Sequence, residues 1–203
     1  MSDAAEANPL GAEDQARAQW YALISRLFHA APDATLLRGL AAAPAGSEGG
    51  ASPFLDAWRA LQAACADADP ETVRAEFDDL FVGVGKAPVT PYTSAYAAGH
   101  APDRHLLALR ECLRGWGLSR RENVFEIEDH VSAVCDAMRW LIEEGWGLQD
   151  QRDFFMTYVD PALPALCSAI KASAAADFYR SAGSLTHAFH GVEKEAFDMH
   201  TES

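Results

Sequence analysis

The spacing of apolar residues constrains the fold of this chain more than any other feature of its sequence. Apolar side chains recur every three or four residues along almost the whole length, and alternating runs rich in Val, Ile and Thr are nearly absent. The first pattern is typical of amphipathic helices, whereas half-buried strands require the second. The sequence therefore predicts an all-α fold, a single helical domain over residues 1–203 with residues 1–12 as a flexible tail.

Capping signals mark where several helices begin. Ser52-Pro53 and Asp69-Pro70 each place a capping side chain directly before proline, an arrangement favoured at helix N-termini. Pro32 with Asp33 marks the end of one helix and the start of the next. Further helices are expected at about 103–116, from about Glu126, and at 150–159, 161–174 and 176–197.

Residues 83–94 form the most irregular stretch, because they hold two glycines and two prolines in twelve positions. They cannot form a continuous helix, and we expect a recognition or hinge loop. Within it, Gly83-Val-Gly-Lys86 suggests a phosphate-binding loop. That motif also requires glycine where this chain has Leu80, and Ser or Thr where it has Ala87. A turn is the simpler interpretation.

Charge narrows the classes of partner. The formal net charge is −14, which argues against DNA, RNA or anionic membrane as the main ligand. The excess is uneven, since residues 101–121 carry +3 and residues 122–160 carry −8. The predicted helix that begins near Glu126 is therefore the acidic pole of the molecule.

The cysteines and the apolar runs indicate a cytoplasmic protein. Cys65, Cys112, Cys135 and Cys167 form no CxxC pair, and we interpret them as reduced, buried thiols. Residues 1–14 carry acids and no basic or apolar region, which argues against a cleaved export signal. No segment approaches the roughly 18 to 20 apolar residues of a membrane-spanning helix.

The segment from Glu126 to His130 admits several roles. Asp129 is suited to capping the backbone amides of the helix start, and Glu126 has i,i+4 spacing to His130, so that its carboxylate can orient the imidazole. Partner recognition, structural capping, and metal or acid–base chemistry all remain open. The sequence contains neither HExxH nor GxSxG.

Two aromatic pairs flank the irregular loop. Phe77 with Phe81 and Tyr92 with Tyr96 have spacings that favour core packing. Their position beside a loop keeps a recognition role open, because loops held on rigid helices often bind partners.

Three motifs together resemble a known family. Residues 76–83 (EFDDLFVG), 88–96 (PVTPYTSAY) and 126–130 (EIEDH) resemble, in order and interval, the TorD/DmsD family of cytoplasmic chaperones for molybdoenzyme maturation. A later region, 176–180 (ADFYR), extends the resemblance over nearly the whole chain. The nitrate-reductase branch of the superfamily is less similar, because its motif after Leu80-Phe81 has no counterpart here.

The resemblance implies a non-enzymatic helical bundle without a cofactor or metal. Such a chaperone binds the twin-arginine leader and the immature catalytic subunit of a molybdenum-cofactor oxidoreductase similar to the DMSO and TMAO reductases, and delays export until the cofactor is inserted. Ile127 and Val84 depart from the family motifs. Carried over to this sequence, the residues expected to bind the peptide are Phe77, Leu80, Phe81, Pro91, Tyr92, Ser94, Tyr96, Glu126, Asp129 and His130.

A physical rationale supports this reading. A twin-arginine leader presents two guanidinium groups and then an apolar stretch, and so requires carboxylates beside apolar side chains. The alternatives are a metal-dependent or nucleotide-hydrolysing helical enzyme that uses Glu126, Asp129 and His130, and a helical scaffold with a solvated acidic face. Both a monomer and a domain-exchanged homodimer are compatible with the resemblance.

Overall fold

The structure is a computed structural model, and it describes residues 10–45, 52–83, 87–96, 102–118 and 128–200. Within these ranges the chain is helical, with no strand and one isolated antiparallel bridge. The elements are α1 (Ala12–His29), α2 (Ala34–Ala41), α3 (Pro53–Asp67), α4 (Pro70–Phe77), the π-helical η1 (Asp78–Val82), the 3₁₀-helical η2 (Thr93–Ala95), α5 (Pro102–Gly115), α6 (Val131–Glu143), α7 (Leu148–Phe154), the π-helical η3 (Phe155–Val159), α8 (Leu163–Ala172) and α9 (Phe178–Met199). The predicted all-α fold is confirmed.

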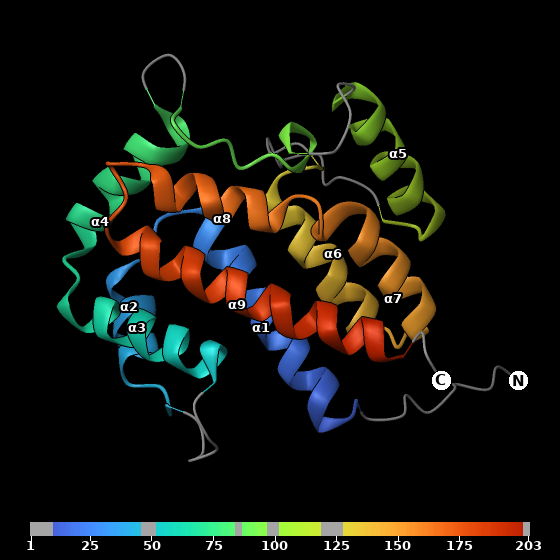
Figure 1. Ribbon diagram of the computed structural model, residues 1–203, viewed down its shortest axis with the longest axis horizontal. Coiled ribbons are helices and arrows are strands. Elements are labelled where there is room, and N and C mark those ends of the chain that lie inside the picture. Colours follow the sequence, from blue (N-terminus) through green and yellow to red (C-terminus); the bar gives the residue numbers. More distant parts are fainter. Residues whose placement is uncertain (1–9, 46–51, 84–86, 97–101, 119–127, 201–203) are drawn as a thin grey trace, which may run out of the picture.

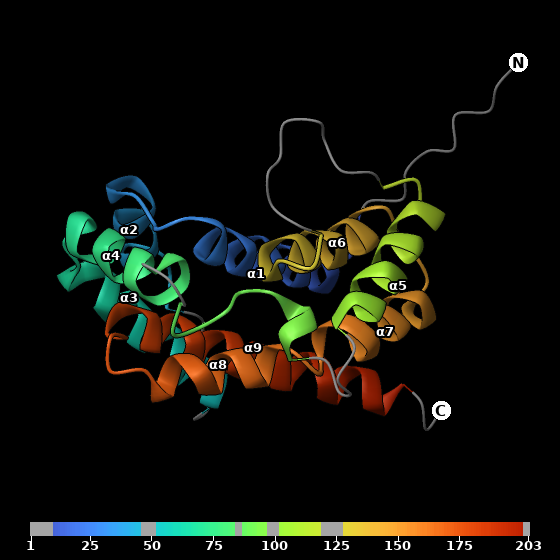
Figure 2. The same ribbon diagram turned by 90° about the horizontal axis from the view of Figure 1, so that it is seen from above.

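The helices pack in two layers, which are clearest in Figure 2. In one layer α1 packs against α6, and in the other α8 packs against α9. The α3 helix also packs against α9, and α2 packs against α3, so α2, α3 and α4 gather at one end of the bundle (Figure 1). The α5 helix lies at the opposite end, beyond α6 and α7 (Figure 1).

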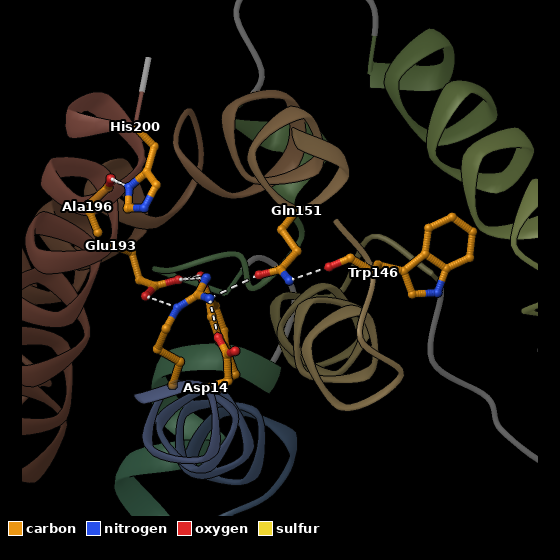
Figure 3. Close-up of polar contacts among 8 residues, drawn as sticks. Asp14, Trp146, Gln151, Glu193, Ala196 and His200 are labelled. Carbon is orange, nitrogen blue, oxygen red and sulfur yellow. Dashed lines mark hydrogen bonds and ion pairs between the residues drawn. The ribbon is translucent and has the colours of Figure 1, made fainter. Parts of the chain in front are cut away.

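A buried ion pair joins α1, α7 and α9 inside this bundle (Figure 3). The guanidinium of Arg17 donates to both carboxylate oxygens of Glu193, at 2.8 and 3.0 Å, and to Gln151 Oε1 at 3.0 Å. The hydroxyl of Tyr21 donates to Glu193 Oε2 at 2.9 Å. Burial is the main cause that raises the pKa of Tyr21, with the Glu193 charge adding to it. The Glu193 carboxylate, 2% exposed, is therefore fully paired.

A second buried carboxylate fixes the start of α9. Glu76, at the end of α4, accepts hydrogen bonds from the backbone N–H groups of Asp177, Phe178 and Tyr179, at 2.8 to 3.0 Å. These amides have no partner within their own helix, and the positive end of the helix dipole favours the negative charge. The first residue of the EFDDLFVG segment is thus a helix cap supplied from a distant part of the chain.

Most predicted helix boundaries agree with the structure to within a few residues. The Asp33 and Asp69 carboxylates accept from the N–H groups of Leu36 and Thr72, as their capping positions predict. Ser52 precedes α3 as expected, but its side chain makes no capping hydrogen bond. The prediction of a helix from Glu126 was wrong, since His130 has an extended backbone (φ −62°, ψ 137°) and α6 begins at Val131.

The thiols agree with the predicted reduced state. All four cysteines are free, with Cys65, Cys135 and Cys167 buried and Cys112 half-buried. Burial raises the pKa of Cys65 to about 11, which leaves its thiol protonated at neutral pH. Within the described ranges, no helix is both long enough and apolar enough to cross a membrane.

Candidate functional site

The irregular loop and the acidic motif meet in the fold, although 35 residues of sequence separate Ser94 from Asp129. The Thr93 N–H donates to the Asp129 carbonyl at 2.7 Å, and the Val131 N–H donates to the Pro91 carbonyl at 2.8 Å. These bonds form the antiparallel bridge between Tyr92 and His130. The second and third sequence motifs are therefore parts of one site, located where α6 begins.

Asp129 lies at the centre of this site, and its side chain is only partly hydrogen-bonded. The residue is 2% exposed. The hydroxyl of Ser94 donates a short hydrogen bond to Asp129 Oδ2, whereas Oδ1 is buried and has no hydrogen-bond partner in the described part of the chain. Because Asp129 directly precedes α6, the positive end of that helix favours its charge. The site thus holds a buried carboxylate with one oxygen available to a donor.

His130 occupies the N-cap position of α6. Its Nδ1 accepts from the Ser132 N–H at 3.2 Å and lies 2.7 Å from Ser132 Oγ. Because Nδ1 is the acceptor in the capping bond, it carries no proton in this arrangement. The capping role that the sequence suggested for Asp129 belongs instead to His130, since the Asp129 side chain is bonded to Ser94.

Tyr92 and Ser94 connect this buried site to the surface, because both are half-buried. The ring of Tyr92 stands edge-on to the His130 ring, with centroids 5.4 Å apart. Tyr96 closes the loop, since its hydroxyl donates to the Thr90 carbonyl at 2.8 Å. The Ser94 hydroxyl thus lies against the Asp129 carboxylate, and the Tyr92 ring lies against His130.

The first motif lies elsewhere, in the core. Leu80 is completely buried, Phe81 is 8% exposed, and Phe77 is half-buried. The ring of Phe81 packs against Phe77 at 5.2 Å and against Tyr179 at 5.1 Å. Burial of Leu80 and Phe81 agrees with the core interpretation of this spacing. It also means that neither side chain lines an open groove as the structure stands.

One backbone hydrogen bond connects the two regions. The Val89 N–H donates to the Leu80 carbonyl at 3.1 Å, so the loop leaves the core motif and runs towards α6 (Figure 1). Gly83 adopts a positive φ of 58° at the end of η1, where a residue with a Cβ is strained. The core motif therefore anchors the start of the loop that carries Tyr92 and Ser94.

Two enzymatic interpretations receive no support from the described residues. No three His, Cys, Asp or Glu side chains in those ranges are grouped closely enough to hold a metal ion. Gly83 follows a helical segment instead of the strand that a phosphate-binding loop requires. Glu126, the remaining predicted site residue, lies outside the described residues, as do Val84 and Ile127.

The sequence did not identify two neighbours of Asp129. Thr93 is buried within the bridge, and His105 of α5 lies with Nε2 3.4 Å from Thr93 Oγ1. Thr93 falls inside the PVTPYTS segment, so its position in the motif was a usable signal. His105 has no local pattern that links it to Asp129, because the two are brought together only by the packing of α5 against η2.

Comparison with known proteins identifies one family. A family model described as nitrate reductase delta subunit matches residues 48–168, which include all three motifs of the loop and site. This is the branch that the motif comparison ranked as less similar. No curated protein matches the chain.

Proposed function

Because the chain belongs to the nitrate reductase delta subunit family, a family of chaperones for redox-enzyme maturation whose members bind molybdoenzyme catalytic subunits, we propose that its Asp129 site binds the twin-arginine leader of such a subunit. The protein would hold its client in the cytoplasm until the molybdenum cofactor is inserted. It acts through binding and not through catalysis.

The unpartnered Oδ1 of Asp129 is the observation that carries this proposal. A buried carboxylate oxygen without a donor is costly, and a guanidinium supplies two parallel N–H donors to such a group. The half-buried Tyr92 ring, which packs against the neighbouring His130, offers an aromatic face on which a guanidinium can stack. Entry requires a local shift of the side chains that now cover Oδ1.

The distribution of charge supports the same ligand. The segment 122–160, which contains Asp129 and α6, carries −8. Such a region attracts a basic peptide over a distance of about 10 Å at 0.1 M salt, and the attraction weakens as salt rises. The affinity for the leader should therefore decrease as the ionic strength increases, which is expected whenever a cationic ligand binds an acidic site.

A peptide titration tests the proposal. The probe is a synthetic peptide with two consecutive arginines followed by an apolar stretch, and binding is measured by calorimetry. We expect Asp129→Asn to weaken binding by about tenfold or more, since a hydrogen bond between charged groups contributes roughly 1.5–3 kcal/mol. The matched control is Asp136→Asn, because Asp136 is exposed on α6, the helix that Asp129 precedes, and its loss changes the net charge equally.

Two outcomes would contradict this assignment. Equal weakening by Asp129→Asn and Asp136→Asn would show that only the overall charge matters. Equal affinity for a peptide with two glutamines in place of the arginines would show that the guanidinium groups are not recognised. The first outcome removes the Asp129 site, and the second removes the leader as ligand.

The closer assignment to the TorD/DmsD branch is also part of the proposal. It depends on the three motifs, and it predicts a client similar to the DMSO and TMAO reductases. Affinity capture of the protein from its native cells, followed by identification of the bound precursor, tests it directly. A precursor with a twin-arginine leader supports the branch, whereas a client without such a leader supports the nitrate-reductase branch.

A further inference from the structure

His105 stands beside the Asp129 site and comes from a different element, α5. Its Nε2 lies 3.4 Å from Thr93 Oγ1, and the Thr93 N–H donates to the Asp129 carbonyl at 2.7 Å. On its other side the imidazole meets the ring of Tyr158 edge-on, with centroids 5.3 Å apart. The imidazole therefore lies between Tyr158 and Thr93, and Thr93 is hydrogen-bonded to the backbone of Asp129.

Two opposing influences act on the proton of His105. Burial lowers the pKa of His105, and the negative charge of Asp129 acts in the opposite direction but does not overcome it. The imidazole is consequently neutral at pH 7. The imidazole becomes a cation, and so a partner for Asp129, only at a pH below the ordinary pKa of histidine.

No other described charge near His105 plays the same part. From η3, Tyr158 faces the ring, and burial raises the pKa of its hydroxyl to about 12, so it is neutral. From η2, Thr93 is not titratable in this range. Glu128, the acid next to Asp129, is paired with Arg110 of α5 at 2.9 Å. Asp129 is thus the charged group to which protonated His105 responds.

We propose that His105 is a positioning and specificity residue of the leader site, which leaves Asp129 open to a guanidinium when neutral and competes for Asp129 when protonated. Binding of an arginine leader is then coupled to release of one proton. A stronger cation displaces the imidazolium, whereas a neutral or weakly basic peptide does not. This inference rests on the proposed leader-binding function, which it deepens by adding a competitor within the site.

The test is a pH series of the same peptide titration. Affinity of the twin-arginine peptide is measured between about pH 5 and pH 7.5 at fixed ionic strength. For the wild type, affinity should fall towards low pH, by up to about tenfold per pH unit below the His105 pKa, the limit for one competing proton. His105→Gln should flatten this profile and bind more tightly than the wild type at the acidic end.

His200→Gln is the control, because His200 is exposed at the end of α9 and its loss removes an equal titrating charge. The control should keep the wild-type profile. An unchanged profile in His105→Gln overturns the inference and leaves the leader site in place. Absence of peptide binding by the wild type at every pH overturns the proposed function and this inference together.

A second measurement uses the free protein and needs no peptide. The imidazole of His105 is titrated by NMR in the wild type and in Asp129→Asn. Removal of the carboxylate charge should lower the midpoint of His105. An identical His105 midpoint in both proteins would show that the two groups do not interact, and would overturn the inference even if His105→Gln failed to fold.

Discussion

Glu193 and Asp129 are two equally buried carboxylates in opposite states of pairing. Each residue is 2% exposed. Both oxygens of Glu193 accept from Arg17, and Oε2 also accepts from Tyr21. Among the described residues, the Asp129 carboxylate accepts only from Ser94, and its Oδ1 has no partner there. Glu193 therefore holds helices together through both of its oxygens, whereas Asp129 keeps one oxygen that can accept a hydrogen bond from the proposed ligand.

The reason for the difference lies in where the donors come from. Arg17 and Tyr21 lie four residues apart on one face of α1, and α9 packs close enough for both side chains to reach Glu193. Around Asp129, the backbone N–H groups of Thr93 and Val131 are already used in the bridge between Tyr92 and His130. Neither of these amides can donate to Asp129 Oδ1 without breaking that bridge.

The largest expected effect is loss of stability when the paired carboxylate loses its partner. Arg17→Met leaves Glu193 buried without its cation, and we expect the free energy of unfolding to fall by about 3–5 kcal/mol. Urea denaturation measures it. Arg26→Met is the control on the same helix, since Arg26 is exposed and its ion pair with Asp33 is long, at 3.9 Å. A similar loss of unfolding free energy in both variants would mean that the buried pair does not hold α1 against α9.

The next largest effect concerns the cap of α9. Glu76→Gln retains the size of the side chain but removes the charge and places an amide donor towards three N–H groups. We expect a loss of about 2 kcal/mol in the free energy of unfolding. Glu71→Gln, on the exposed face of the same helix, should lower the free energy of unfolding by only about 0.3 kcal/mol. An unchanged free energy of unfolding in Glu76→Gln would contradict the capping role.

Asp129→Asn should change stability by less than about 1 kcal/mol, although Asp129 is as buried as Glu193. The asparagine oxygen still accepts from Ser94, and the other position of the side chain had no partner to lose. The same variant should lose peptide affinity. Thermal unfolding and the titration together distinguish the roles, because a loss of 3 kcal/mol or more would make Asp129 a tether like Glu193.

The sequence predicted the fold better than the site, and particular residues show why. Asp33 and Asp69 cap their helices through local hydrogen bonds, which a sequence pattern captures. The Glu76 cap reaches across about a hundred residues, and no local spacing reveals it. The start of α6 was misplaced because acids at 126–129 resemble a first helical turn, whereas pairing with the loop keeps His130 extended.

The motifs of the site were found individually, but their grouping was not predictable. Loop residues Tyr92 and Ser94 meet Asp129 through a bridge that depends on tertiary packing. The spacing of Phe77 and Phe81 indicated core, and burial in the structure agrees with this. The motif therefore contributes to the site through the loop it anchors.

The smallest expected effect tests a third carboxylate, Asp160, whose partners are complete. Burial alone raises the pKa of Asp160, but hydrogen bonds from Lys194 and His190, at 2.9 and 2.8 Å, outweigh it and lower the pKa. Burial also lowers the pKa of His190, more than Asp160 raises it. Because the unfolded chain then takes up the His190 proton first, stability should fall as the pH drops below about 6.5.

His190→Gln should reduce this pH dependence, because it removes the group that binds a proton more readily in the unfolded chain. The measurement is the free energy of unfolding from denaturant titrations between about pH 5 and pH 7.5. His200→Gln is the control, since His200 lies exposed at the C-cap of the same helix, away from His190. A slope that decreases equally in both variants would show that burial of His190 against Phe155 does not set its protonation, and that Asp160 is paired chiefly with Lys194.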